Sequence, residues 1–180
     1  MTFKGRAIRR RTLLGAGLSI AAAGSIVSLP RWKGDSRWRF FSDDEARTVE
    51  AICGQLIPAD RDPGAREAGV VNYIDIQLTR HFKRWQAVYR RGAASLDAAS
   101  RMKFGKRFVE LSAGQQVEAL RDAEQNSKEF FELILAHCRQ GYYGDPRHGG
   151  NRNMASWKML RLPFPPLRGR MHYDDQPKVG

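Results

Sequence analysis

The stretch Phe130–Cys138 reads FFELILAHC and is the most apolar helical segment of the chain. Wound as a helix, it carries apolar side chains on nearly every side rather than along one face. This pattern is typical of a helix that other helices surround. We therefore expect a central helix that begins at about Ser127, with the rest of the fold packed around it.

Two capping boxes predict where other helices begin. Ser42 stands three residues before Glu45, and Ser112 stands three residues before Gln115. In each pair the two side chains can satisfy amides that the first helical turn leaves without partners. Apolar residues then recur every three or four positions, as on one buried helix face: Ala46, Val49, Cys53 and Leu56 after the first box, and Val117, Leu120 and Ala123 after the second.

The same periodicity predicts helices over residues 70–82 and 85–104. No segment alternates apolar and polar residues as a strand does, and no internal repeat occurs. We therefore expect an all-α fold, a compact domain of about five helices over residues 42–160. Residues 30–41, basic and aromatic, should form an extended lead-in that lies on the domain or on a partner.

A long stretch rich in glycine and aromatic residues follows the central helix. Residues 141–157 read GYYGDPRHGGNRNMASW, a composition that argues against a regular helix or strand. Its aromatic side chains would be costly to leave in water, so we expect an ordered loop that binds a partner. The alternative is a loop that only caps the domain's own core. The residues expected to form this surface or to hold its shape are Tyr142, Tyr143, Asp145, Arg147, His148, Asn151, Arg152 and Trp157.

Residues 161–180 should form an extended arm after the helical domain. Pro163, Pro165 and Pro166 fix backbone angles and remove amide donors, which disfavours a further helix. Such an arm either wraps the domain or lies along a partner.

The amino-terminal residues 1–29 have the composition of an export signal. Arg10 and Arg11 precede one spacer residue and the apolar pair Leu13 and Leu14, and a modest apolar stretch follows. The arginine pair resembles the twin-arginine signal of bacteria, which implies export of an already folded protein. A transmembrane anchor is the alternative, but the stretch is shorter than the roughly 20 residues that a spanning helix needs. We therefore expect a periplasmic protein.

The net charge of +12 is divided unequally along the chain. Five basic residues and no acidic ones lie in residues 1–29, which leaves 26 basic and 19 acidic residues in the remainder. A moderately basic domain suits an acidic partner, a membrane surface or nucleic acid. Acidic residues interrupt the basic runs and the chain has an export signal, so we do not expect nucleic acid to be the partner.

Cys53 and Cys138 lie on the apolar faces of two different predicted helices. In an exported protein two cysteines favour one disulfide. Two buried thiols that never meet, or a bond to another subunit, are the alternatives. Two isolated cysteines do not supply the ligand set of a zinc or iron–sulfur site, so we expect no metal site.

The histidines offer little catalytic chemistry. No two of them have metal-ligand spacing, and His137 is expected to be a core or helix-end residue. A catalytic set of Cys138, His148 and Asp145 can be drawn, but a cysteine on an apolar helix face is a poor nucleophile. The glycine patterns of nucleotide-binding loops are absent from the sequence. We therefore predict no catalytic and no cofactor-binding residues.

Two motifs, GYYGDPRHGGN at residues 141–151 and IPAD at residues 57–60, carry a family resemblance. With the export signal, they make the chain similar to the gluconate 2-dehydrogenase subunit 3 family over roughly residues 41–170. Members of that family are small subunits of periplasmic, membrane-bound sugar or sugar-acid dehydrogenases. In these complexes a large FAD-containing subunit oxidises the substrate, and a multihaem cytochrome c subunit passes electrons to the respiratory chain.

The resemblance implies a non-catalytic subunit without a cofactor of its own. FAD and haem c are then expected in the partner subunits, and the complex would hold the chain at the inner membrane. The small subunit would help the flavoprotein to mature, to leave through the twin-arginine export machinery and to assemble. The alternative is a stand-alone periplasmic enzyme or ligand-binding module that uses the loop at residues 141–157.

Overall fold

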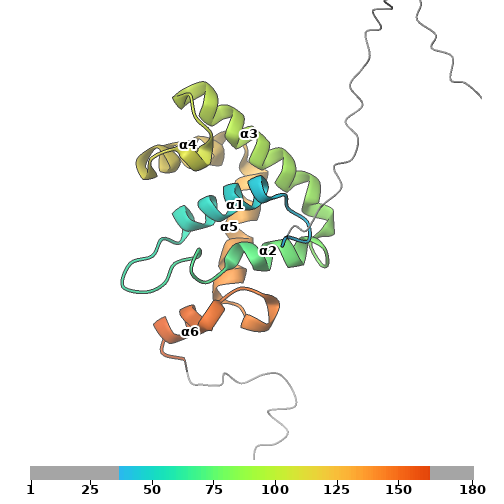
Figure 1. Cartoon of the computed structure of the whole chain (residues 1–180), viewed down its shortest axis with the longest axis vertical. Helices are drawn as coiled ribbons and strands as arrows, with labels where there is room; N and C mark the ends of the chain where they lie inside the picture. Colours follow the sequence, from blue (N-terminus) through green and yellow to red (C-terminus); the bar gives the residue numbers. More distant parts are fainter. Residues whose placement is uncertain (1–36, 163–180) are drawn as a thin grey trace, which may run out of the picture. The chain divides into compact units, whose positions relative to one another are not determined.

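The computed structural model describes residues 37–162, and within them the fold is all-helical with no strand. The predicted export signal (Arg10, Arg11, Leu13 and Leu14) and the arm from residue 163 lie outside the described residues. Six α-helices follow one another (Figure 1): α1 Asp43–Leu56, α2 Val70–Leu78, α3 Gln86–Phe104, α4 Ala113–Asn126, α5 Lys128–Tyr143 and α6 Ala155–Met159. Four short 3₁₀-helices connect them: η1 Lys83–Trp85, η2 Phe108–Glu110, η3 Pro146–His148 and η4 Arg152–Met154.

Both predicted capping boxes are confirmed. The Glu45 amide donates to Ser42 Oγ over 3.2 Å, and the Ser42 amide donates to Glu45 Oε2 over 2.8 Å. Ser112 and Gln115 exchange the same pair of hydrogen bonds at the start of α4. These reciprocal bonds satisfy first-turn amides, which explains why α1 and α4 begin directly after the two serines.

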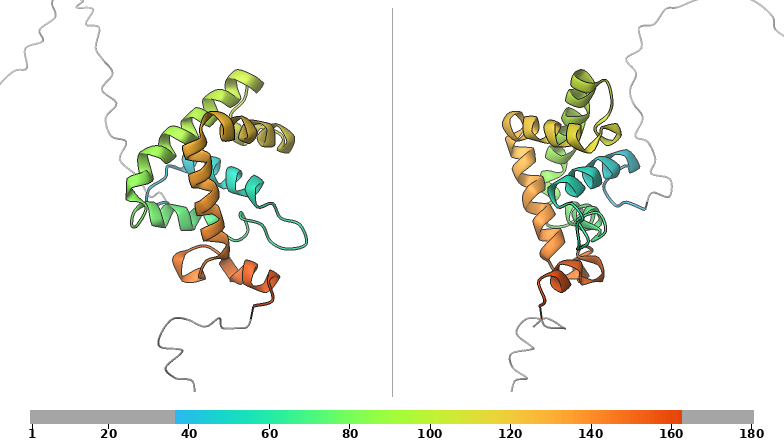
Figure 2. Two further views of the ribbon diagram at one scale, coloured as in Figure 1. Left: turned by 180° about the vertical axis from the view of Figure 1, so that it is seen from behind. Right: turned by 90° about the vertical axis from the view of Figure 1, so that its left-hand side faces the viewer.

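Helix α5 is the central element, because it packs against each of the other five α-helices. In Figure 2 it runs from the α3–α4 end of the domain to the α6 end, with α1 and α2 along its middle. Its buried side chains include Phe130, Ile134 and Tyr142. The expectation that neighbours surround it on nearly every side is only partly correct, since the face with Glu132 and Ala136 is exposed.

The predicted start of the irregular loop at Gly141 is wrong, because α5 continues through Gly141, Tyr142 and Tyr143. Glycine stands at 141 for a packing reason rather than as a helix breaker. A Cβ atom there would lie 2.8 Å from Cδ1 of Tyr73 on α2, so only glycine allows this close approach. The irregular loop therefore spans residues 144–154, and the last part of the predicted stretch forms α6.

Helix α2 ends at Leu78, four residues before the predicted end at residue 82. Two side chains occupy the carbonyl groups that would otherwise continue it. Thr79 Oγ1 donates to the Ile76 carbonyl over 2.8 Å, and Gln86 Nε2 donates to the Leu78 carbonyl over 2.8 Å. Such side-chain bonds satisfy free carbonyls at a helix end.

The described part of the lead-in, residues 37–41, is fixed to the domain by one buried carboxylate. Asp75 of α2 accepts hydrogen bonds from the amides of Arg39, Phe40 and Phe41 over 2.7, 2.9 and 3.0 Å. Phe40 and Phe41 are buried in the core. Residues 37–41 of the expected lead-in therefore lie on the domain, and residues 30–36 fall outside the described residues.

Within residues 37–162, the longest apolar helices still fall short of what a bilayer-spanning segment requires. The same residues contain no group of three or more His, Cys, Asp or Glu side chains that could hold a metal ion.

Candidate functional site

The loop at residues 144–154 lies at the carboxyl end of α5 and leads into α6 (Figure 1). The α3–α4 end of the domain is at the opposite end of α5. The eight side chains predicted for this site divide into two groups. Some are buried and hold the loop in shape, and the others are exposed at its surface.

Asn151 is the main buried fastening of the loop. Its side chain has no exposed surface, and it donates from Nδ2 to the Gly144 carbonyl over 2.9 Å. Its Oδ1 accepts from the Ser156 amide over 3.0 Å, in the first turn of α6. One amide side chain therefore joins the beginning of the loop to the helix that follows it.

Tyr142 and Trp157 fix the loop at its two ends. The Tyr142 hydroxyl donates to the Pro63 carbonyl over 2.6 Å, which ties α5 to the connection between α1 and α2. Trp157 Nε1 donates to the Tyr143 carbonyl over 3.0 Å, which ties α6 to the end of α5. Both side chains are buried, and burial raises the pKa of Tyr142. These two residues thus support the loop's shape from inside.

Two glycines allow the loop to lie directly on the helices. Gly150 packs against the Gly141 carbonyl, where a Cβ atom would overlap that oxygen. Gly149 has a left-handed φ of +98°, and its carbonyl accepts from Asn72 Nδ2 of α2 over 2.7 Å. Asn72 belongs to the site, but no sequence pattern marks it, because its role depends on the contact between α2 and the loop.

Asp145 and Arg147 form a local pair at the surface. Asp145 Oδ1 accepts from the Arg147 amide over 2.9 Å, and Oδ2 accepts from Arg147 Nε over 3.0 Å and pairs with NH2 over 2.9 Å. The hydrogen bond from Asp145 raises the pKa of Arg147. The Arg147 side chain remains exposed, so the carboxylate holds a guanidinium in a defined position at the surface.

Three non-glycine residues of this segment, Asn151, Asn153 and Met154, have φ between 43° and 57°. Asparagine tolerates the left-handed region better than most residues do, because its short polar side chain can form local hydrogen bonds, which methionine cannot. The cost of this conformation is about 1–2 kcal/mol for a residue such as Met154. Backbone strain of this kind persists only where surrounding contacts determine the conformation, and it clusters at functional sites.

Large apolar side chains are exposed to solvent in this part of the site. Tyr143 is 46% exposed, and Leu160 and Leu162 are 51% and 42% exposed. Trp157 links the two segments, since its Nε1 donates to the Tyr143 carbonyl and its own carbonyl accepts from the Leu162 amide over 2.9 Å. His148 and Arg152 are exposed as well. The sequence did not single out Leu160 and Leu162, because a leucine near a helix end ordinarily indicates core.

Cys53 and Cys138 lie close together in the core. Both are buried free thiols in the structure, and Cys138 Sγ donates to the Cys53 carbonyl over 3.9 Å. The hydrogen bond from Cys138, together with burial, raises the pKa of Cys53 well above its ordinary value. A disulfide between them stays a prediction.

His137 is a core residue, as predicted. Its ring stacks on Phe82 with 3.8 Å between centroids, and its Nδ1 lies 3.0 Å from the Tyr89 hydroxyl. Burial lowers its pKa from 6.5 to about 4, so the imidazole is neutral at pH 7.

The catalytic set of Cys138, His148 and Asp145 is not assembled. Cys138 is fully buried and bonded to a core carbonyl, whereas His148 is exposed on the loop. The Asp145 carboxylate binds Arg147. A buried thiol cannot reach a substrate held at the loop. The loop is thus held by hydrogen bonds to its own domain and presents a partly apolar surface.

Comparison with known proteins gave one match. The family model described as gluconate 2-dehydrogenase subunit 3 matches residues 43–163, from the first residue of α1 to just beyond α6. No curated protein and no solved structure matches the chain.

Proposed function

The chain belongs to the gluconate 2-dehydrogenase subunit 3 family, and on that basis we propose that it is the non-catalytic small subunit of a periplasmic sugar or sugar-acid dehydrogenase. Membership makes it a subunit of a gluconate 2-dehydrogenase-like complex. In the proposal it docks on a large FAD-containing subunit and assists its maturation, export and assembly. A multihaem cytochrome c subunit completes the complex at the inner membrane.

The observation that carries this proposal is the rigid loop with exposed apolar side chains. Asn151, Tyr142 and Trp157 fix the loop through hydrogen bonds of 2.6–3.0 Å, so little order remains to be imposed when a partner binds. Tyr143 and Arg147 are both exposed, and Asp145 holds the Arg147 guanidinium in an ion pair. Tyrosine and arginine are residue types in which binding energy concentrates at protein interfaces.

The proposal predicts that the purified complex contains cofactors on other chains. The full chain, tagged and purified gently from its own cells, should bring larger chains that show flavin and c-type haem absorbance. A colourless preparation of the chain alone would contradict the proposal. Oxidation of gluconate or a related sugar acid by the isolated chain, with an artificial acceptor, would contradict its non-catalytic role.

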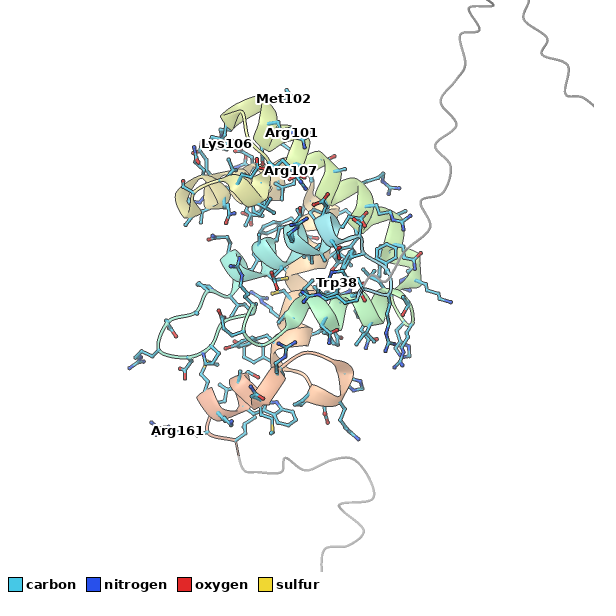
Figure 3. The ribbon with its side chains drawn as sticks, viewed as in Figure 1. Trp38, Arg101, Met102, Lys106, Arg107 and Arg161 are labelled. Carbon is cyan, nitrogen blue, oxygen red and sulfur yellow. The ribbon has the colours of Figure 1, made fainter. Side chains whose placement is uncertain are left out.

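A paired variant tests the loop as the contact. Tyr143→Ser with Arg147→Ala should reduce the recovered flavoprotein at least tenfold, because one large aromatic and one arginine contact are lost. Met102→Ser with Arg101→Ala is the matched control at the far end of the domain (Figure 3), where Met102 is 89% exposed. Equal recovery with both variants would exclude the loop as the docking surface.

A further inference from the structure

A polar cavity of about 250 Å³ lies where the lead-in, α1, the start of α2 and η4 meet. Figure 3 shows Trp38, one of its lining residues, lying over the α1 and α2 region of the domain. The side chains that define its chemistry are Arg37, Trp38, Glu50, Arg66, Asn72 and Arg152. Only Arg152 among them belongs to the loop described above.

Three arginine residues line this cavity, and they come from three separate segments. Arg37 comes from the lead-in, Arg66 from the connection before α2, and Arg152 from η4. Over residues 37–162 none of the three has an acidic partner within 4.0 Å, although eight other ion pairs form there. Glu50 is the one acidic side chain among the described residues that line the cavity, so its local charge is positive.

The local backbone places these guanidinium groups rather than leaving them loose. Arg152 packs on Gly69, where a Cβ atom would lie only 3.2 Å from its NH2 nitrogen. Arg66 packs on Gly54 of α1, 3.7 Å from the corresponding Cβ position. Arg37 lies over the Trp38 ring, 4.3 Å from its centroid. Each guanidinium group thus has a neighbour in the domain that limits its position.

The start of α2 adds to the positive potential. This helix of nine residues begins after Gly69, which provides no side-chain cap, and Val71 and Asn72 of its first turn line the cavity. The amides of Val70 and Asn72 donate to the carbonyls of Ala65 and Gly69, so the contribution here is that of the helix dipole, which favours negative charge at the amino terminus. The helix end and the three arginines therefore act in the same direction.

We propose that this cavity is a docking pocket for carboxylate side chains of the dehydrogenase chain on which the small subunit sits. The inference rests on the proposed function, since it concerns the same partner. A polypeptide partner presents its negative charge as Asp and Glu carboxylates, and guanidinium groups bind these through paired hydrogen bonds. Charge complementarity of this kind determines which partner binds and in which register.

The test compares two triple variants of the full chain in its own cells. Arg37→Gln, Arg66→Gln and Arg152→Gln remove the pocket's charge, whereas Arg80→Gln, Arg121→Gln and Arg139→Gln remove equal charge from exposed positions elsewhere. Flavoprotein recovered with the tagged chain is measured for each at low and at physiological salt. Unchanged thermal melting of both variants shows that the domain is folded.

The pocket variant should recover at least tenfold less flavoprotein than the control variant, and the difference should be larger at low salt. Equal recovery with the two variants would overturn the pocket while leaving the proposed function intact. Failure of the unaltered chain to recover flavoprotein would overturn both. Micromolar binding of citrate to the isolated chain, lost in the pocket variant, would assign the pocket to a free small carboxylate and overturn the protein partner.

Discussion

His137 lies between aromatic rings in the core, and this environment determines its charge. Its pKa falls to about 4, whereas in an unfolded chain the imidazole titrates near 6.5. The unfolded state therefore takes up a proton first as the pH falls. The stability that this residue contributes is complete above about pH 6.5 and is lost progressively between pH 6.5 and 4.

We expect the free energy of unfolding to drop by about 2 kcal/mol between pH 7 and pH 5 because of His137. Urea unfolding at several pH values measures this drop. His137→Gln should remove that part of the pH dependence, whereas His81→Gln, at an exposed position, should leave it unchanged. The same pH slope in both variants would show that another group is responsible.

Asp75 is a second residue whose role depends on burial. Its carboxylate satisfies three consecutive backbone amides, and hydrogen bonds to a charged group contribute more than neutral ones. Asp75→Asn replaces one acceptor oxygen with a donor that faces those amides. We expect it to lower the free energy of unfolding by about 2–3 kcal/mol.

Hydrogen exchange locates that effect. The amides of Phe40 and Phe41 should exchange much faster in Asp75→Asn, and the amides in the middle of α5 should be affected less. Asp43→Asn, at an exposed carboxylate in the first turn of α1, is the control and should cost only a few tenths of a kcal/mol. Unchanged protection of residues 39–41 would contradict the role assigned to Asp75.

At the scale of elements, the contact between the loop and α5 depends on glycine at Gly150. A Cβ atom at this position would overlap the Gly141 carbonyl, so Gly150→Ala must displace the loop from α5. We expect a loss of about 2 kcal/mol or more in unfolding free energy. Gly114→Ala is the matched control, because no atom lies within 4 Å of its Cβ position in α4. It should stabilise the chain by about 0.5–1 kcal/mol.

The elements show which features sequence alone can predict. Ser42 and Ser112 predict where α1 and α4 begin, because capping is a local interaction between residues three apart. The predicted end of α5 is wrong for the opposite reason. Residue 141 is glycine because Tyr73 and Gly150 pack closely against it, and neither contact can be read from the sequence. The pairing of Asp75 with amides some 35 residues earlier was likewise not foreseen.

The residues of the candidate site divide in the same way. Composition predicted an ordered, aromatic loop over residues 141–157, and the structure places the residues chosen from it at different depths, from fully buried to exposed. The sequence could not separate Asn151, which is wholly buried, from Arg147, which is exposed. The cavity with Arg37 and Arg66 was missed, because three distant segments build it.

At the scale of the whole molecule, the loop surface and the arginine cavity are linked. Arg152 belongs to η4 of the loop and also lines the cavity, and its amide donates to the Ala68 carbonyl over 2.9 Å. A partner that covers Tyr143 and extends past η4 would therefore contact both the loop surface and the arginine cavity. The two proposals together describe one contact region along the α2 and α6 side of the domain.

The two cysteines bear on the stability of the whole chain. They are 85 residues apart, and closing a loop of that length would stabilise the fold by about 4–5 kcal/mol through its effect on the unfolded state. We expect the protein purified from its own cells to contain this disulfide, as the proposed export to the periplasm implies. Denaturation with an alkylating reagent and no reductant should then leave both cysteines unmodified in the mass spectrum. Two added alkyl groups would show that they remain thiols.

The position of Asp75 also sets an order of events while the chain is being made. Residues 39–41 leave the ribosome 34–36 residues before the carboxylate that holds them. At roughly 5–20 residues per second, they wait about 2–7 seconds for their acceptor. The first stretch of the domain to be synthesised can thus be secured only after α2 has emerged. During that interval its aromatic residues are open to chaperones and proteases.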